Sequence, residues 1–310
     1  MNQMGEFALG APAAPVEPAA PGTQPAPKIL GRSRWLSFQL PPFNRAEPTE
    51  RVIGHRGSRG TQPENTLPAF AEAWENGCRV LETDAQVTAD GVVVCFHDDT
   101  LARVTGLPGT VADYTFAELQ DRAWVHGPHE RKARILRLED LINDFKYAEL
   151  IVDIKDARVI DPLVRVINQT RAAGRMCVTH AWDAWLEEIR DRTSPLLQRN
   201  LGWETMAELV RSVRDGTPAD PGLRVANWVH IAWRDFERPV MADPDFSARL
   251  VTAAHQLGMG VRVWTVNDFS EAARLYNEGV DAIFTDYPKQ MVQLAREQDR
   301  QRERAKILEL

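Results

Sequence analysis

The chain has 310 residues, a formal net charge of −7 and three cysteines, Cys78, Cys95 and Cys177. This length suits one large domain with flanking segments, and the negative charge excludes a general basic surface for nucleic acid. The odd, small number of cysteines argues against a disulfide framework and favours small core residues.

The two ends of the chain differ in composition from the middle. Residues 1–27 are rich in Ala, Pro and Gly and cannot bury a core, so we expect a disordered tail. Residues 28–50 carry aromatic residues among basic ones; we expect them to pack on the domain, with a weak membrane-surface contact as the alternative. Residues 296–310 are expected to form a charged helical tail. No signal peptide or membrane-spanning run is evident, so a cytoplasmic location is expected.

The first predicted strand, residues 52–54, stops at His55-Arg56-Gly57. Residues 63–66 then open a helix. Its expected apolar face carries Leu67, Phe70, Ala71 and Trp74. One interpretation of this opening makes Asn65 the helix cap and Glu64 a first-turn charge.

A second predicted strand, residues 79–86, places Glu82 and Asp84 two positions apart and therefore on one face. Two carboxylates on a buried face repel each other unless a positive charge lies between them, and a divalent cation with oxygen ligands would provide it. Asp90-Gly91 then signals a tight hairpin turn, which returns the chain to present His97 near the carboxylates. We infer that one end of a sheet gathers His55, Arg56, Glu82, Asp84 and His97.

Strands and helices continue to alternate through the rest of the chain. The later predicted strands are residues 148–156, 176–181, 199–203, 227–233, 260–266 and 282–285. With the first two, they make eight strands, each followed by a helical stretch, which implies parallel strands with crossover helices. We therefore predict an α/β fold, a (β/α)8 TIM barrel with a small β-hairpin and loop insertion after strand two.

Several short motifs occur in a fixed order in this chain. H-R-G, P-E-N-T, E-x-D, T-x-D-G and H-D lie between Arg51 and Asp99, and Asp153–Lys155, Trp264–Asn267 and Thr285–Pro288 follow. Together they resemble the glycerophosphodiester phosphodiesterase family, within the phosphatidylinositol phospholipase C-like phosphodiesterase superfamily. The resemblance covers residues 51–295, the expected catalytic domain. Each motif alone is weak, and their common order makes the signal strong.

The expected metal site consists of oxygen ligands. Glu82, Asp84 and Asp153 come from neighbouring predicted strands and suit Ca²⁺ or Mg²⁺. The resemblance adds Glu64 as a ligand or a residue beside the ligands. The family ordinarily has glutamate where Asp153 stands, so the preference between the two metals stays open.

The resemblance implies that His55 and His97 act as acid and base on a phosphodiester, with the two roles unassigned. A phosphodiester monoanion needs charge neutralisation and a proton for its leaving alkoxide. Arg56 would provide a planar fork for phosphate oxygens, and Lys155 a second positive charge. The nucleophile is either water or the substrate's own glycerol hydroxyl.

Aromatic residues follow several predicted strand ends. Trp264 is expected to pack against the glycerol moiety, with a core position as the alternative. His180 ends a strand on the catalytic face, so it either contacts substrate or is satisfied at the rim. Trp182, Trp185 and Trp233 could form an aromatic rim that holds an acyl chain or a choline-like cation.

These residues support a leading hypothesis and two alternatives. The leading one is metal-dependent hydrolysis of glycerophosphodiesters to sn-glycerol 3-phosphate and an alcohol. The second is lysophospholipase D-type hydrolysis of lysophospholipids on the same barrel, which the aromatic rim would favour. The third is a catalytically inactive barrel that binds phosphodiesters, which would be expected to have lost one of the site residues.

Overall fold

The computed structural model describes residue 47, residues 49–232 and residues 243–308. The expected tail at 1–27, nearly all of the segment 28–50 and Trp233 lie outside these residues.

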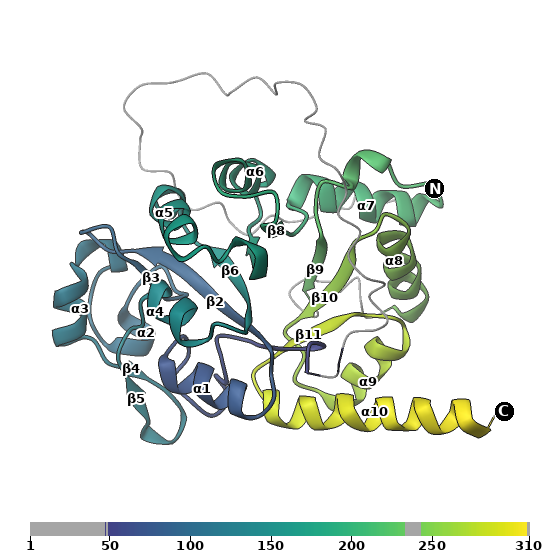
Figure 1. The fold of residues 1–310 in the computed structure, drawn as a ribbon, viewed down its shortest axis with the longest axis horizontal. Helices are drawn as coiled ribbons and strands as arrows, with labels where there is room; N and C mark the ends of the chain where they lie inside the picture. The colour runs from purple at the N-terminus through teal and green to yellow at the C-terminus, as the bar shows by residue number, and fades with distance from the viewer. Residues whose placement is uncertain (1–46, 48, 233–242, 309–310) are drawn as a thin grey trace, which may run out of the picture. The chain divides into compact units, whose positions relative to one another are not determined.

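Figure 1 shows the alternation of strands and helices. The strands are β1 (Val52–Gly54), β2 (Val80–Val87), β3 (Val93–Cys95), β4 (Val125–His126), β5 (Lys132–Ala133), β6 (Glu149–Ile154), β7 (Met176–Thr179), β8 (Gln198–Arg199), β9 (Trp228–Ala232), β10 (Gly260–Trp264) and β11 (Ala282–Thr285). The helices are α1 (Leu67–Glu75), α2 (Ala102–Thr105), α3 (Phe116–Arg122), α4 (Leu138–Asp144), α5 (Ile160–Thr170), α6 (Asp183–Arg192), α7 (Trp203–Asp215), α8 (Pro244–Gln256), α9 (Phe269–Asn277) and α10 (Pro288–Leu308).

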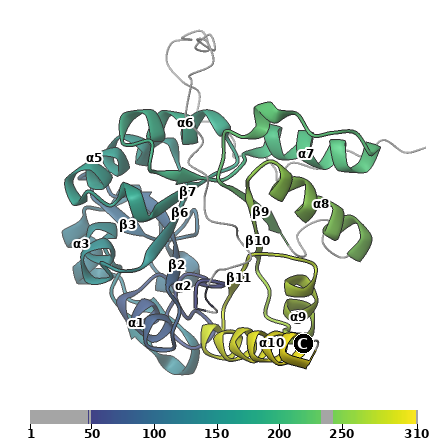
Figure 2. The ribbon, with the colours of Figure 1, turned by 45° about the vertical axis from the view of Figure 1, so that its right-hand side comes forward.

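Eight strands of the described chain lie side by side in parallel, in the order β8-β7-β6-β2-β1-β11-β10-β9. The two ends of this row meet just after β8, where Asn200 bridges to Trp228 of β9. There the backbone N–H of Leu201 donates to the Trp228 carbonyl at 2.9 Å. Helices surround the ring of strands (Figure 2). The predicted (β/α)8 barrel is confirmed.

The barrel strands are buried on both faces, as expected for a parallel sheet covered by helices. Inside the barrel, Ile53, Ile151 and Phe284 belong to one apolar cluster. The inward-facing positions of β2 and β6 then continue to Asp84 and Asp153, which are direct neighbours in the register. Polar groups therefore replace apolar ones at the carboxyl ends of the strands. The three cysteines are buried and free, as the sequence indicated.

The long connection between β2 and β6, residues 88–148, carries β3, α2, α3, β4, β5 and α4. β3 pairs antiparallel with β2, with Cys95 opposite Ala85. Beyond β3, the connection has an apolar cluster of its own, which includes Phe96, Leu101 and Leu119. His97 lies two residues after β3, so this connection brings a polar residue back to the carboxyl ends of the barrel strands.

Two expectations for α1 are wrong. Leu67 is 43% exposed, because the helix faces the barrel through Ala69, Phe70 and Ala73 and its first turn lies beside a pocket instead. Asn65 does not cap the helix, since Thr66 holds the N-cap position.

The last strands and helices follow the prediction with shifted ends. The strand expected at 199–203 ends at Arg199, because the chain turns into α7, where the Trp203 N–H donates to the Ala181 carbonyl at 2.7 Å. Met291 and Val292 of α10 are buried, as expected for the start of the C-terminal helix. Across the described ranges, none of the helices combines the length and apolar character needed to cross a membrane.

Candidate active site

Two neighbouring barrel strands carry aspartates that both contact the ammonium group of Lys155. Lys155 Nζ lies 2.8 Å from Asp84 Oδ1 and 2.6 Å from Asp153 Oδ2. Thr179 Oγ1 of β7 also donates to Asp153 Oδ1 at 2.9 Å. Burial acts to raise the pKa of Asp84, but the charges of Lys155 and Arg56 lower it overall. The structure thus brings Asp84, Asp153 and Lys155 together, as expected, with the ammonium between the carboxylates.

Glu82 is a buried carboxylate next to a second carboxylate, Asp84. Burial, together with the charge of Asp84, raises its pKa well above the ordinary glutamate value. The backbone N–H of Arg56 donates to Glu82 Oε2 at 2.8 Å. The Arg56 backbone is left-handed, with φ of 49°. Glu82 therefore favours either a proton or a further positive charge nearby.

Arg56 is buried among carboxylates. Its Nη1 donates to Glu64 Oε1 at 2.9 Å, and its Nε lies 3.3 Å from Asp84 Oδ2. Asn65, which follows Glu64, donates through Nδ2 to Asp84 Oδ2 at 2.8 Å and accepts from Thr83 Oγ1 at 2.8 Å. The loop between β1 and α1 is thereby fixed to β2 by its side chains.

His55 forms a buried pair with an aspartate from another strand. Its Nδ1 lies 2.7 Å from Asp286 Oδ1, just beyond β11, which pairs with β1. Asn267 Nδ2 holds the other oxygen of Asp286 at 2.8 Å. Burial lowers the pKa of His55, and the bond to Asp286 opposes this effect. With Nδ1 engaged by a carboxylate, the ring presents Nε2 for proton transfer.

His97 forms a second pair of the same kind. Its Nδ1 lies 2.8 Å from Asp98 Oδ1, and its side chain is half-buried. Burial lowers the pKa of His97, while the nearby charges of Asp84 and Lys155 act in opposite directions. The structure therefore places His97 beside the carboxylates, as the hairpin predicted.

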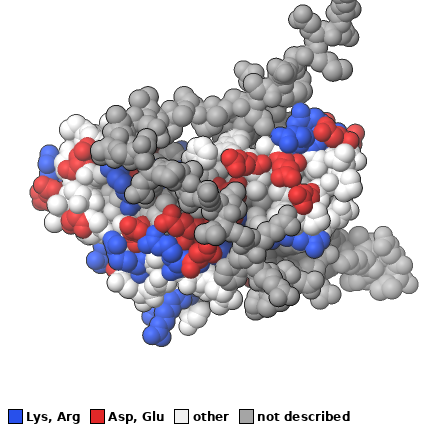
Figure 3. Space-filling view, turned by 90° about the horizontal axis from the view of Figure 1, so that it is seen from above, with Lys and Arg blue, Asp and Glu red and all other residues white. Residues whose placement is uncertain are grey.

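Glu64 and Asp98 share a partner that sequence analysis did not single out. Arg103 contacts both carboxylates, and Glu64 lies among Arg56, Arg59 and Arg103. Burial acts to raise the pKa of Glu64, but the hydrogen bond from Arg103 and the neighbouring charges lower it overall. Figure 3 shows acidic and basic side chains next to one another on the described part of one face.

The residues expected to contact substrate, Trp264 and His180, lie at or just after the ends of barrel strands. Trp264 is 37% exposed at the end of β10, so the core alternative is wrong. The His180 ring stacks on Trp185 at 4.2 Å between ring centroids, and its Nδ1 accepts the Trp182 N–H at 2.9 Å. Trp182 itself is 56% exposed.

Asp286 and Arg103 were missed as site residues, although Asp286 lies in the Thr285–Pro288 motif quoted above. The available signal for Asp286 was its position directly after the eighth strand, which neighbours the first in a closed barrel. Arg103 offered no comparable signal, because its contacts depend on how the long connection folds back.

Comparison with known proteins identifies the family. Residues 55–290 match the model of the glycerophosphoryl diester phosphodiesterase family. A glycerophosphodiester phosphodiesterase of Caldanaerobacter subterraneus is 29% identical over 257 residues, covering 79% of this chain and 97% of that protein.

Solved structures of related phosphodiesterases have a fold similar to that of this chain. An Oleispira antarctica phosphodiesterase in complex with the product sn-glycerol-3-phosphate has a TM-score of 0.59 and 25% identity, covering 80% of this chain and 96% of that one. A glycerophosphodiester phosphodiesterase of Agrobacterium tumefaciens supports the fold alone, with a TM-score of 0.63 and 19% identity over 78% of this chain and 99% of that one. The chain belongs to the glycerophosphoryl diester phosphodiesterase family, a family of phosphoric diester hydrolases.

Proposed function

We propose that this protein hydrolyses glycerophosphodiesters to sn-glycerol 3-phosphate and an alcohol, with His55 and His97 as acid and base. The observation that carries the proposal is the pair of histidines, each bound at Nδ1 by an aspartate, beside a cluster of buried cations and carboxylates. The product bound to the Oleispira antarctica relative supports sn-glycerol 3-phosphate as the product here. An intact set of these groups argues against an inactive barrel.

The chemistry assigned to the side chains is a displacement at phosphorus. One histidine accepts the proton of the nucleophile as the new P–O bond forms. The other donates its proton to the alkoxide as the old P–O bond breaks. Arg56 and Lys155 would bind the phosphate oxygens and stabilise the developing charge. The nucleophile is either water or the substrate's own glycerol hydroxyl. Attack by the hydroxyl would expel the alcohol and form a cyclic phosphate first, which water would then open to sn-glycerol 3-phosphate by the same acid–base exchange.

The proposal includes dependence on a divalent metal ion. Within residues 47, 49–232 and 243–308, no three His, Cys, Asp or Glu side chains are grouped to hold an ion. Even so, the raised pKa of buried Glu82 and its closeness to Asp84 fit a site that gains a cation. Glu82, Asp84 and Asp153 would hold Ca²⁺ or Mg²⁺, provided that Lys155 moves from between the last two. Bound there, the ion would act as a Lewis acid towards the phosphate.

Glu64 is the weakest member of the proposed ligand set. Its carboxylate already contacts Arg56 at 2.9 Å and Arg103 at 2.6 Å. It would ligate an ion only if these pairs opened. Beside the site, it holds Arg56 in place, which is the second of the two roles that the family resemblance implied.

The second candidate is lysophospholipase D-type hydrolysis. Exposed Trp182 and Trp264, with the stacked pair of His180 and Trp185, give the site an apolar border past β7 and β10. Such a border suits an acyl chain or a choline-like cation. Substrate contact by Trp264 and His180 is part of both proposals.

The test is release of glycerol 3-phosphate from glycerophosphocholine, and of lysophosphatidic acid or choline from lysophosphatidylcholine, with Ca²⁺, Mg²⁺ or EDTA. Turnover of the water-soluble diester that EDTA abolishes supports the leading proposal with its metal. Turnover of the lipid alone would replace it by the second candidate. Turnover that is unaffected by EDTA would overturn metal dependence, and no turnover of either would contradict both candidates.

A further inference from the structure

Arg103 joins two parts of the chain that carry different parts of the site. It lies on α2 in the long connection, and its side chain is 47% exposed. Its Nη2 and Nη1 contact the two oxygens of Glu64 at 2.6 and 3.1 Å. Its Nε and Nη2 contact the two oxygens of Asp98, the second at 2.9 Å. One guanidinium therefore makes a two-pronged contact with each of two carboxylates.

Each of these carboxylates holds one proposed functional group. Asp98 Oδ1 lies 2.8 Å from His97 Nδ1, and Glu64 Oε1 lies 2.9 Å from Arg56 Nη1. Arg103 is thus linked to His97, a proposed acid or base, through Asp98. It is linked to Arg56, a proposed phosphate-binding residue, through Glu64. Because a guanidinium is planar and carries five donors, it can fix both carboxylates at once, which a lysine ammonium cannot do with the same geometry.

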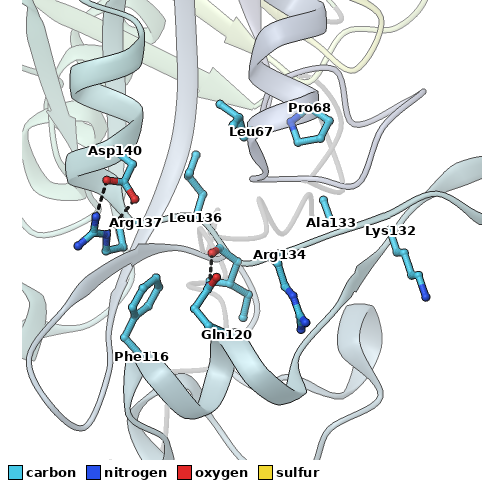
Figure 4. Close-up of a pocket in the computed structure, with 11 residues that line it drawn as sticks. Leu67, Pro68, Phe116, Gln120, Lys132, Ala133, Arg134, Leu136, Arg137 and Asp140 are labelled. Atoms are coloured by element: carbon cyan, nitrogen blue, oxygen red, sulfur yellow. Dashed lines mark hydrogen bonds and ion pairs between the residues drawn. The ribbon is translucent and has the colours of Figure 1, made fainter.

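The boundary between the long connection and α1, called the seam below, is incompletely packed, so a link across it would help to hold the two parts in place. A pocket of about 600 Å³ opens there (Figure 4). Leu67 and Pro68 of α1 lie on one side, and Phe116 and Gln120 of α3 on the other. Side chains that line a void lack packing partners on that side. The position of the long connection relative to the barrel therefore depends more strongly on contacts elsewhere along the seam.

Other contacts across the seam are independent of Arg103. Arg131 Nη1 donates to the Thr61 carbonyl, in the loop before α1, at 2.6 Å. Within the long connection itself, Leu101 and Val104, which are near Arg103 in sequence, are buried in its apolar cluster. We therefore expect the connection to remain folded and attached when the Arg103 side chain is removed.

We propose that Arg103 is a positioning residue for the reaction. Through Asp98 it orients the His97 ring, and through Glu64 it fixes the Arg56 fork, so that the two keep their spacing around one phosphate. The inference rests on the proposed function, since it assigns Arg103 to the same site.

The experiment compares Arg103→Ala and Arg103→Lys with the wild type, using glycerophosphocholine. Arg137→Ala is the matched control, because the Arg137 side chain is 43% exposed and pairs with Asp140 three positions away on its own segment. We expect Arg103→Ala to lower kcat about 10- to 100-fold through misplacement of His97, with KM changed less than about twofold. Arg103→Lys should recover only part of this loss, and Arg137→Ala should match the wild type.

A rise in KM with kcat unchanged would make Arg103 a substrate contact and overturn the proposal. A kcat within twofold of the wild type would also overturn it. In a double-mutant cycle with Asp98→Asn, coupled effects are expected, and additive ones would contradict the route through Asp98. If Arg103→Ala does not fold, Arg103→Lys serves in both measurements.

A second readout separates this inference from the proposed function. The imidazole ¹⁵N resonances of His97, assigned with His97→Ala, should move in Arg103→Ala and stay in Arg137→Ala. A wild type without turnover would contradict the proposed function, yet these spectra would still test the positioning role. Unchanged His97 resonances in Arg103→Ala would overturn it.

Discussion

At the scale of single residues, the proposed site contains two histidines that each pair with an aspartate through Nδ1. Asp286 holds His55 from an adjacent strand, while Asp98 holds His97 from the next position in the chain. A carboxylate at Nδ1 selects the tautomer that carries its proton there and leaves Nε2 to exchange a proton with substrate. Neutral amides in place of these aspartates would keep the shape and lose the charge.

Asp286→Asn is expected to lower kcat about 10- to 100-fold, because the His55 ring loses the charge that orients and supports it. The measurement is steady-state hydrolysis of glycerophosphocholine. Asp281→Asn is the control, since Asp281 forms a similar pair with His255, 2.8 Å apart and next to the opposite ends of the strands. That variant should keep its kcat, and an equal loss in both would refute a specific role for Asp286.

The buried position of His55 also predicts how activity depends on pH. Burial lowers its pKa below the ordinary value of 6.5. If His55 is the base, it works when neutral, so kcat/KM should rise with pH along a limb whose midpoint lies below 6.5. Asp286 opposes the lowering, so Asp286→Asn should shift this limb to still lower pH. A midpoint above 6.5 in the wild type would contradict His55 as the base.

At the scale of elements, the loop between β1 and α1 shapes the site through its backbone. Arg56, Gly57 and Asn65 all have positive φ, at 49°, 81° and 58°. The Asn65 N–H donates to the Arg56 carbonyl at 3.0 Å, which closes the loop on itself. Sequence patterns singled out this loop and its proposed functional residues, with helix capping as one interpretation of Asn65. Local signals alone could not show that its amide is needed by Asp84, which comes from β2.

Gly57→Ala should disrupt this loop. An added Cβ would lie 2.5 Å from the backbone carbon of Ala69 on α1, at a position with φ of +81°. We expect a loss in the free energy of unfolding of about 1–3 kcal/mol from overpacking, in addition to the cost of the left-handed backbone.

Gly91→Ala provides the comparison for Gly57→Ala. Gly91 has the same φ of +81°, and nothing lies within 4 Å of its added Cβ. Only the backbone cost of about 1 kcal/mol should therefore remain. Denaturant unfolding of both variants measures the difference, and equal losses would show that the contact with Ala69 is not limiting.

At the scale of the whole molecule, the alternation of strands and helices was sufficient to predict the barrel. The eight-strand count also implied that residues towards the carboxyl ends of the strands would gather at one end of the barrel, and Asp84, Asp153 and Lys155 do so. Contacts that depend on closure of the barrel were harder to predict from the sequence. Asp286 reaches His55, for example, because β11 pairs with β1. The link from Arg103 to Glu64 depends on the fold of the long connection, which was predicted only as a β-hairpin and loop insertion.

Leu67 illustrates the same limit. Its spacing from Phe70 placed it on the apolar face of α1, but whether that face is covered depends on neighbouring elements. There the long connection leaves a pocket beside the first turn, so the side chain stays exposed.

The central claim is that His55 and His97 carry out acid–base catalysis on a glycerophosphodiester. Its most direct test is the rate of glycerol 3-phosphate release from glycerophosphocholine by the wild type, His55→Ala and His97→Ala, with melting temperatures recorded for all three. We predict that each substitution lowers kcat about 10²- to 10⁴-fold while the protein stays folded. A folded variant of either kind that keeps a rate near that of the wild type would contradict the claim.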